Sequence, residues 1–375
     1  MPGLQLLTPV ALGPYNLRNR VVMAPLTRMR SGPRNVPRPL NVEYYRQRAS
    51  AGLIISEASP VSPFGHGYHD TPGIHTREQA EGWKTVVDAV HEVGSRMFLQ
   101  LWHVGRMSHP DLQPGNVLPV GPSALSANEK VYTRDGPKDT PVPRALRTPE
   151  IRGVVDEFRR GAELAMDAGF DGVEIHAANG YLLEQFLASG SNTRPDEYGG
   201  SVENRARLIL EVTDAVSRVW GADRTGIRLS PANRYGSIED RDRRGCWGYV
   251  IGQLGSLGLA YVHLVEPRVN NSTEVENPDE RLNSANFRPL LHMATKLLSA
   301  GGHTLETAEP AIASGRADLA VFGRLFVSNP DLPRRFEIGA PLNPYDRSTF
   351  YGGNAKGYTD YPLLPESAVT KRPNL

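Results

Sequence analysis

A buried strand that turns into a helix is predicted by Gly172-Val-Glu-Ile-His-Ala-Ala-Asn-Gly-Tyr181-Leu-Leu-Glu-Gln-Phe-Leu187. Val173 and Ile175 alternate with polar residues, so this strand has one apolar face and one polar face. The apolar face must be buried against another layer of the protein. The stretch therefore predicts a strand inside a layered α/β protein, with a helix directly after it.

Three polar side chains crowd together where this strand ends, at His176, Asn179 and Tyr181. Gly180 can adopt backbone angles that are closed to other residues, which suits a tight turn that presents its neighbours to a cleft. A polar turn of this kind is either a satisfied helix cap or an active site. The rest of the chain has to decide between them.

The whole chain repeats one pattern, in which a short apolar run alternates with a helical stretch. The apolar runs are Val21–Leu26, Leu53–Ala58, Met97–Trp102, Gly172–Ala177, Thr225–Ser230, Tyr261–Glu266, Leu297–Gly301 and Leu319–Arg324. Helical periodicity is found at Asn41–Ala51, Glu78–Val93, Pro149–Ala168, Val202–Trp220, Gly245–Leu257, Phe287–Thr295, Leu305–Ser314 and Asp331–Glu337. Eight such units predict an α/β fold of the (β/α)8 TIM-barrel type.

The connections add detail to this barrel. An N-terminal hairpin is predicted over residues 4–19. The Pro- and Gly-rich residues 103–147 are predicted to form a long excursion after the third strand, and excursions of this length often cover a functional site. An open nucleotide-binding sheet is the alternative, but its Gly-rich turn is missing after the first strand, where Ala24–Thr27 stands. We therefore expect one domain over residues 1–375, with the tail 340–375 at the rim of the active site.

Composition excludes several classes of function. The 375 residues carry a net charge of +1, which gives no field for nucleic acid or an anionic membrane. Cys246 is the only cysteine, so intramolecular disulfides, Cys-ligated zinc and iron–sulfur clusters are excluded. No run reaches the roughly 18 apolar residues of a membrane span, and the start of the sequence has no leader pattern. We expect a cytoplasmic protein with a small-molecule partner.

Strand parity brings four polar side chains into the barrel. Alternate residues of each strand point inward, which selects Gln100, His176, Arg228 and His263. A guanidinium is costly to bury without a partner, so Arg228 needs an anion. Glu174 is one possible structural partner, and a bound ligand that gains negative charge during turnover, such as a flavin, is the other.

The end of the chain carries a phosphate-binding pattern. Ala300-Gly-Gly-His-Thr304 closes the seventh strand and Val321-Phe-Gly-Arg324 closes the eighth. Loops after these two strands commonly hold a phosphate through backbone N–H groups, and an arginine can pair with its oxygens. Gly-Gly alone is a weak signal, but its place on these strands together with Arg324 strengthens it.

At this point the chain resembles the Old Yellow Enzyme family of FMN-dependent ene-reductases over essentially its full length. The matching stretches are Val22-Met-Ala-Pro-Leu-Thr-Arg-Met29, Gln100-Leu-Trp-His-Val-Gly-Arg106, Glu174–Leu187, Ser191-Asn-Thr-Arg-Pro-Asp-Glu-Tyr-Gly-Gly-Ser201, Gly323-Arg-Leu-Phe-Val-Ser-Asn-Pro-Asp331, Tyr351-Gly-Gly and Gly357-Tyr-Thr-Asp-Tyr361. The chain is similar to the branch that has Thr, rather than Cys, at the position of Thr27.

The resemblance implies a tightly but non-covalently bound FMN. Thr27 would bind the flavin ring near O4, Gln100 and Arg228 the pyrimidine edge, and Arg324 the phosphate. The remaining cofactor contacts implied in this way are Pro25, Ala58, His176, Gly302 and Gly323.

The resemblance also implies the catalytic groups. His176 and Asn179 would bind the substrate oxygen as an oxyanion hole does, and Tyr181 would deliver a proton. Tyr68, Trp102 and Tyr351 would shape the substrate pocket. NADPH or NADH would reduce the flavin first and leave before the alkene binds, in a ping-pong cycle that shares one pocket.

The leading hypothesis is therefore an NAD(P)H-dependent oxidoreductase that reduces the activated C=C bond of α,β-unsaturated carbonyl or nitro compounds. Alternatives are a reductase acting mainly on nitrate esters or nitroaromatics, a flavin-binding barrel that senses or stores without turnover, and a metal-dependent hydrolase. Sequence leaves open the physiological substrate, the choice between NADH and NADPH, the stereoselectivity, and whether the protein is a monomer or a homodimer.

Other polar groups remain without a function. A metal site is not expected, because loop histidines are ordinarily solvated; the candidate ligands set aside are His66, His69, Asp70, His103, His109 and Asp111. The segments 232–244 and 270–283 follow strand ends without a recognisable pattern, so we expect both to lie at the pocket rim.

Overall fold

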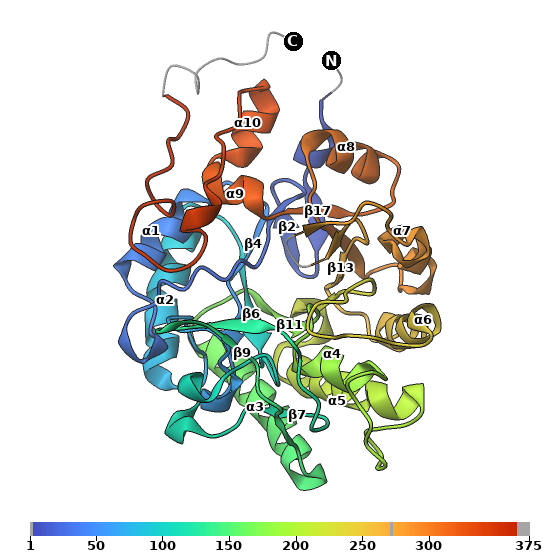
Figure 1. The fold of residues 1–375 in the computed structure, drawn as a ribbon. Coiled ribbons are helices and arrows are strands. Elements are labelled where there is room, and N and C mark those ends of the chain that lie inside the picture. The colour runs from blue at the N-terminus through green and yellow to red at the C-terminus, as the bar shows by residue number, and fades with distance from the viewer. Residues whose placement is uncertain (1–2, 271–272, 366–375) are drawn as a thin grey trace.

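A computed structural model describes residues 3–270 and 273–365. In this part of the chain, eight parallel strands close into a barrel that is ringed by helices (Figure 1). The barrel strands are β3 (Val21–Met23), β4 (Leu53–Ile55), β6 (Met97–Trp102), β11 (Gly172–Ala177), β12 (Thr225–Leu229), β13 (Tyr261–Val265), β16 (Lys296–Ala300) and β17 (Leu319–Phe322). Each pairs with the next, and β17 pairs back onto β3. The predicted (β/α)8 barrel is confirmed, and the open sheet is wrong.

The helices follow the predicted alternation. They are α1 (Pro39–Gln47), α2 (Arg77–Glu92), α3 (Thr148–Asp167), α4 (Leu182–Leu187), α5 (Val202–Trp220), α6 (Arg243–Gly255), α7 (Ser284–Phe287), α8 (Leu305–Ala313), α9 (Arg324–Ser328) and α10 (Leu332–Ile338). Their starts have local causes: Thr76, for example, caps α2 by accepting from the backbone N–H of Gln79. In the described residues, no helix has both the length and the apolar character needed to cross a bilayer.

Strand parity is as predicted, because the two faces of the strands belong to different clusters. Leu99, Leu101, Val173 and Ile175 pack outward with the helices in the main core. Phe98 instead belongs to a second cluster, inside the barrel. The polar faces of β6 and β11 therefore meet in the barrel interior.

Aromatic side chains fill the amino end of the barrel. The rings of Phe98 and Tyr261 lie 5.8 Å apart there. Each occupies space that a neighbouring glycine leaves open: a Cβ on Gly172 would lie 2.5 Å from the Phe98 ring, and one on Gly226 would lie 2.2 Å from the Tyr261 ring. This packing leaves the carboxyl end as the open end of the barrel.

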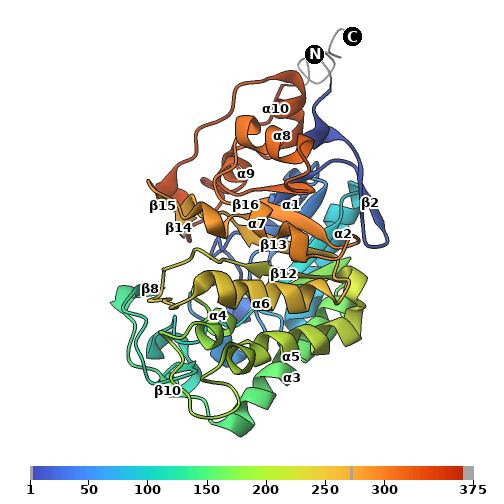
Figure 2. The same ribbon diagram turned by 90° about the vertical axis from the view of Figure 1, so that its right-hand side faces the viewer.

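The smaller strands cover the two ends. The predicted hairpin is formed by β1 (Val10–Leu12) and β2 (Tyr15–Leu17). The other short strands are β5 (Ser59–Pro60), β7 (Val120–Gly121), β8 (Lys130–Thr133), β9 (Gly136–Asp139), β10 (Arg144–Ala145), β14 (Val269–Asn270) and β15 (Thr273–Glu274). Figure 2 shows β8, β14 and β15 on one side of the molecule and β2 on the opposite side. The 103–147 excursion, which contains β7 to β10, therefore lies at the open end.

One predicted helix is wrong. Periodicity indicated Phe287–Thr295, but α7 ends at Phe287, a 3-10 turn covers Arg288–Leu290, and the backbone becomes extended at Leu291. Asn283 caps the segment earlier, by accepting from the N–H of Asn286. Pro289 also lacks the N–H that a continuing helix would need. Capping and proline chemistry therefore override the weak apolar spacing here.

Candidate active site

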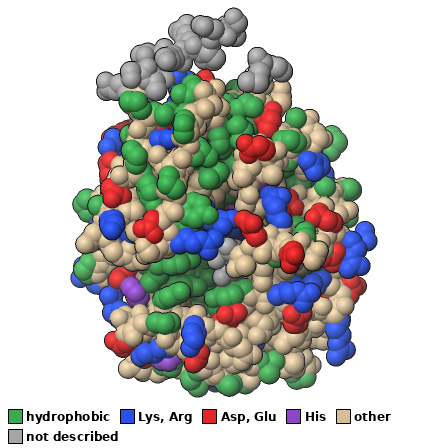
Figure 3. All heavy atoms as spheres, turned by 45° about the horizontal axis from the view of Figure 1, so that its top comes forward, with side chains coloured by type: hydrophobic (Ala, Val, Ile, Leu, Met, Phe, Trp, Pro, Cys, Tyr) green, Lys and Arg blue, Asp and Glu red, His purple; other side chains and the backbone are tan. Residues whose placement is uncertain are grey.

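A cavity of about 970 Å³ opens at the carboxyl end of the barrel. Every residue to which the family resemblance assigned a catalytic, cofactor-binding or substrate-pocket role lines it: Pro25, Thr27, Ala58, Tyr68, Gln100, Trp102, His176, Asn179, Tyr181, Arg228, Gly302, Gly323, Arg324 and Tyr351. Figure 3 shows hydrophobic side chains around a hollow in this face, with basic side chains along one edge. Residues from strand ends far apart in sequence thus share one space.

The turn after β11 aims its side chains into this cavity. Asn179 and Gly180 both have left-handed backbone angles, with φ of 58° and 83°. A Cβ on Gly180 would lie 2.6 Å from the carbonyl oxygen of Tyr235, so glycine is needed here. Ser230 accepts a hydrogen bond from the Asn179 N–H at 2.8 Å. The turn is therefore fixed by backbone contacts that leave its side chains available.

A buried carboxylate that sequence reasoning missed also holds this turn. Glu184 accepts hydrogen bonds from Gly180 N at 2.6 Å, Ser230 Oγ at 3.0 Å and Asn233 Nδ2 at 3.1 Å. Burial raises the pKa of Glu184 to about 7. Its position one turn into α4 was the available signal, but its partners belong to the next strand-end loop.

His176 is a buried, neutral imidazole. Its ring stacks against Trp102 at a centroid distance of 6.2 Å, and its Nδ1 has no hydrogen-bond partner among the described residues. Burial holds the pKa of His176 well below its usual value, and the positive charge of Arg228 adds to that effect. An imidazole in this state offers one N–H donor to a ligand.

Tyr181 is a buried phenol beside this imidazole. It is the N-cap residue directly before α4, and its ring meets Trp102 edge-on at a centroid distance of 4.9 Å. Its hydroxyl lies 3.3 Å from the hydroxyl of Tyr68. Burial raises the pKa of Tyr181, so the phenol keeps its proton at neutral pH.

The predicted convergence inside the barrel is found. Strand register places Gln100 opposite Glu174, His176 opposite Arg228, and Arg228 opposite His263. Glu174 accepts a hydrogen bond from Gln100 Nε2 at 2.6 Å and lies 2.8 Å from Nδ1 of His263. The carboxylate is thus already engaged by two neighbours.

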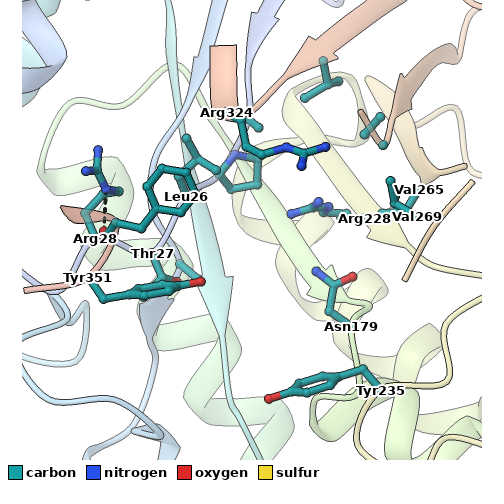
Figure 4. Close-up of a pocket in the computed structure, with 18 of the residues that line it drawn as sticks. Leu26, Thr27, Arg28, Asn179, Arg228, Tyr235, Val265, Val269, Arg324 and Tyr351 are labelled. Carbon is teal, nitrogen blue, oxygen red and sulfur yellow. Dashed lines mark hydrogen bonds between the residues drawn. The ribbon is translucent and has the colours of Figure 1, made fainter. Parts of the chain in front are cut away.

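Arg228 has no such partner. Its guanidinium forms neither a hydrogen bond nor an ion pair with any residue in the described ranges, and its Nε is buried and unsatisfied. Burial lowers the pKa of Arg228, while the charge of Glu174 opposes this effect from beyond contact distance. Figure 4 shows Arg228 and Asn179 pointing into the space that separates them from Tyr351. Glu174 is not its hydrogen-bonding partner, and the site calls for a polar or anionic ligand.

A second corner of the cavity suits a phosphate. Gly302, with φ of 68°, follows β16, and Gly323 precedes α9. Arg324 lies beside them, 3.6 Å from a carboxylate oxygen of the largely exposed Glu274. An exposed ion pair of this kind is weak and readily exchanged for a stronger anion. The cavity size, the unsatisfied Arg228 and this glycine–arginine corner together fit FMN.

The two unassigned segments and the excursion do reach the cavity rim. Tyr235 comes from the segment 232–244, Glu274 from the described part of 270–283, and Tyr132 from β8. Residues 271–272 lie outside the described residues, as do residues 366–375 of the predicted tail. Sequence could place these loops at the rim but could not tell which side chain in each would face inward.

The histidines set aside as solvated are partly buried. His66 lies 3.4 Å from His75, and burial lowers the pKa of His66 to about 3. Burial likewise lowers the pKa of His103 to about 4. The expectation of solvated rings is wrong for these two, because the 103–147 excursion covers them. In the described part of the chain, no three His, Cys, Asp or Glu side chains are grouped to hold a metal ion.

Comparison with known proteins gives consistent matches. The model of the NADH:flavin oxidoreductase / NADH oxidase family matches residues 5–343. The chain is 48% identical over 368 residues to 12-oxophytodienoate reductase 1 of Oryza sativa subsp. japonica, covering 97% of this chain and 94% of that protein. It is 44% identical over 382 residues to flavin oxidoreductase hxnT of Emericella nidulans, covering 96% and 97%.

Solved structures agree with these sequence matches. Morphinone reductase in complex with tetrahydroNAD superposes with a TM-score of 0.91 at 48% identity, covering 99% of this chain and 100% of that chain. The old yellow enzyme homologue from Zymomonas mobilis superposes with a TM-score of 0.92 at 42% identity, covering 96% and 100%.

Proposed function

This chain belongs to the NADH:flavin oxidoreductase / NADH oxidase family, to which the Old Yellow Enzymes belong, and from that premise we propose a specific reaction. The protein uses NAD(P)H and FMN to reduce the activated C=C bond of α,β-unsaturated carbonyl or nitro compounds. The observation that carries this proposal is that the end of β11 and the turn after it bring a neutral imidazole, a free carboxamide and a protonated phenol into one cavity. The relatives named as reductases of 12-oxophytodienoate and of morphinone support it.

The first role is stabilisation of negative charge. When the β-carbon of an activated alkene is reduced, charge builds on the remote oxygen. His176 and Asn179 provide two donors for that oxygen, and neither side chain is engaged by another described residue. Donors that are already in place stabilise developing charge strongly in a site that excludes water.

The second role is protonation. The α-carbon needs a proton on the side opposite the incoming hydride, and Tyr181 keeps its proton because burial raises the pKa of the phenol. The Tyr68 hydroxyl, 3.3 Å away, can donate a hydrogen bond to the phenolate as it forms. FMN, when bound, supplies the hydride that it has received from the nicotinamide.

The remaining residues would hold the FMN and orient the substrate. Arg228 and Gln100 would bind the polar edge of the flavin ring. Thr27, Pro25 and Ala58 would contact the rest of the flavin. Arg324, with the backbones of Gly302 and Gly323, would hold the phosphate. Tyr68, Trp102 and Tyr351 would shape the substrate space. We also infer a cytoplasmic enzyme, because its single cysteine, Cys246, is buried and forms no disulfide. The same proposal takes it to act as a monomer or a homodimer.

The pH dependence follows from two pKa shifts. His176 has a pKa well below its usual value, so it stays neutral until the solution becomes distinctly acidic, and Tyr181 has a raised pKa, so it stays protonated in mild base. The rate of alkene reduction by the pre-reduced enzyme should be constant between about pH 6 and about pH 9. A stopped-flow pH profile measures this. A limb near pH 6.5 that disappears in His176→Gln would contradict the neutral imidazole.

The decisive experiment is spectroscopic and kinetic. The purified protein should be yellow, and its NAD(P)H consumption should rise on addition of cyclohexenone, with cyclohexanone as the product. Arg228→Met should weaken FMN binding by about tenfold or more, because a charged hydrogen-bonding group is lost. Arg218→Met, which removes an exposed ion pair on α5, is the matched control. A protein that stays colourless after FMN is added contradicts the proposal.

A further inference from the structure

Two buried arginines follow Thr27 closely in the sequence. Arg28 and Arg30 each have only 1% of their surface exposed. Neither guanidinium forms an ion pair with a carboxylate of the described residues. Glu57 accepts a hydrogen bond from the backbone N–H of Arg28 at 3.2 Å, and its charge acts to raise the pKa of both guanidinium groups without contacting them. Burying such groups is costly unless their donors are satisfied in another way.

Most donors of Arg28 are satisfied by one distant loop, residues 349–358, and one is satisfied by the Tyr44 hydroxyl at 3.1 Å. Its guanidinium donates to the carbonyl oxygens of Phe350 at 2.8 Å, Gly357 at 2.8 Å and Thr349 at 3.3 Å. The N–H of Gly352 donates back to the carbonyl oxygen of Arg28 at 2.9 Å. The two segments are therefore bound in both directions.

Arg30 binds the same loop from a second point. It donates to the carbonyl oxygens of Thr349 at 2.8 Å, Asn354 at 2.9 Å and Lys356 at 3.2 Å, and to that of Arg28 at 3.0 Å. These acceptors come from both ends and the middle of the loop. A single planar guanidinium thus fixes the path of the backbone between residues 349 and 356.

An aromatic stack closes the far side of this arrangement. The ring of Tyr358 stacks on Tyr44 of α1 at 4.0 Å, and the guanidinium carbons of Arg28 and Arg30 lie 5.0 Å and 4.7 Å from its centroid. Asn41 donates to the Tyr358 hydroxyl at 3.0 Å. Cations over aromatic faces are stabilised, most of all where water is excluded.

The loop held in this way carries part of the cavity wall. Phe350 and Tyr351 line the cavity together with Thr27 and Arg28. Figure 4 shows Tyr351 beside Thr27, with the hydrogen bond from Arg28 to the loop drawn as a dashed line. The Tyr351 ring also stacks on Tyr132 of β8 at 5.8 Å. The pocket mouth is therefore assembled from three distant parts of the chain.

We propose that Arg28 and Arg30 are positioning residues that set substrate specificity, because they fix Tyr351 and Phe350 relative to the flavin-contacting segment. This inference rests on the proposed function for its kinetic consequence. Lysine would keep the charge, but its three N–H donors share one nitrogen and could not reach the separated carbonyl oxygens that the planar guanidinium binds from three nitrogens. The shape of the mouth thus depends on the guanidinium group itself.

The kinetic test compares Arg30→Lys and Arg30→Met with the wild-type enzyme, in the presence and absence of Tyr351→Ala. Each arginine variant should raise the KM for a ring-substituted cyclohexenone about tenfold, with kcat and the flavin absorption spectrum nearly unchanged. In the Tyr351→Ala background the same substitutions should change KM by less than about twofold, as a double-mutant cycle requires for coupled residues. Arg46→Met, which removes an exposed pair with Glu43 on α1, is the matched control.

Hydrogen–deuterium exchange of the wild-type and Arg30→Lys holoproteins gives a second readout, independent of turnover. Amides of residues 349–357 should exchange faster in Arg30→Lys, while those of β11 should not change. If no alkene is reduced by any variant, the proposed function fails and the exchange result still tests the loop. The positioning role is overturned by unchanged KM and exchange in Arg30→Lys, or by a KM effect that persists in full without Tyr351.

Discussion

Tyr181→Phe is expected to lower the rate of alkene reduction by about 10²–10⁴-fold, the usual contribution of a positioned general acid. The substitution removes a hydroxyl but keeps the ring that packs edge-on against Trp102 at 4.9 Å. Reduction of the bound flavin by NAD(P)H needs no phenol, so that half of the cycle should proceed at nearly the wild-type rate. Anaerobic stopped-flow measurements of the two halves separate these effects.

The control for this prediction is Tyr68→Phe. It removes a hydroxyl 3.3 Å from that of Tyr181, on the same side of the cavity, but leaves the acid itself in place. A smaller loss than in Tyr181→Phe is expected. Equal losses in both variants, or an equal slowing of both halves of the cycle in Tyr181→Phe, would show that the phenol is not the specific proton source.

The second large effect is expected from the pair that binds the substrate oxygen. His176→Ala and Asn179→Ala should each reduce kcat/KM for an enone by about 10²–10³-fold, as removal of one oxyanion-hole donor does elsewhere. The double variant should lose less than the product of the two factors, since the donors act on one oxygen. Steady-state kinetics at saturating NAD(P)H measure all three variants.

His176→Gln supplies the matched comparison, because it keeps an N–H donor while replacing the ring. It should recover part of the activity lost in His176→Ala. Each variant should still bind FMN, since Arg228, Gln100 and the phosphate corner are untouched, although the His176 variants lose one implied flavin contact. Activity that survives both alanine substitutions would mean that the substrate oxygen is bound elsewhere.

The barrel and the core of the site were predictable because both follow local rules. Alternation within β6, β11 and β12 decides which side chains point inward, and the closed barrel then brings Gln100, His176 and Arg228 together whatever the loops do. Gly180, in the turn after β11, similarly indicates a left-handed backbone, because glycine adopts such angles without steric cost.

The parts that escaped prediction depend on contacts between distant segments. Arg28 and Arg30 bind backbone carbonyl oxygens about 320 residues further along the chain. Every residue has such a carbonyl, so the sequence does not indicate which ones will accept these hydrogen bonds. Glu184 was visible, but its partners Ser230 and Asn233 could not be assigned to it. The false helix at Phe287–Thr295 failed for a different reason, because a proline and an early cap outweighed its apolar spacing.

The rings of Phe98 and Tyr261, seated against Gly172 and Gly226, seal the floor of the barrel. In the described part of the chain the cavity consequently opens at the carboxyl end of the barrel, so reactants and products would pass through the same mouth. If the proposed ping-pong cycle holds, an alkene that arrives while the enzyme is still oxidised would occupy the space that the reductant needs and would have to leave unchanged. High alkene concentrations should then slow turnover, and turnover should be fastest when NAD(P)H is in excess over the alkene.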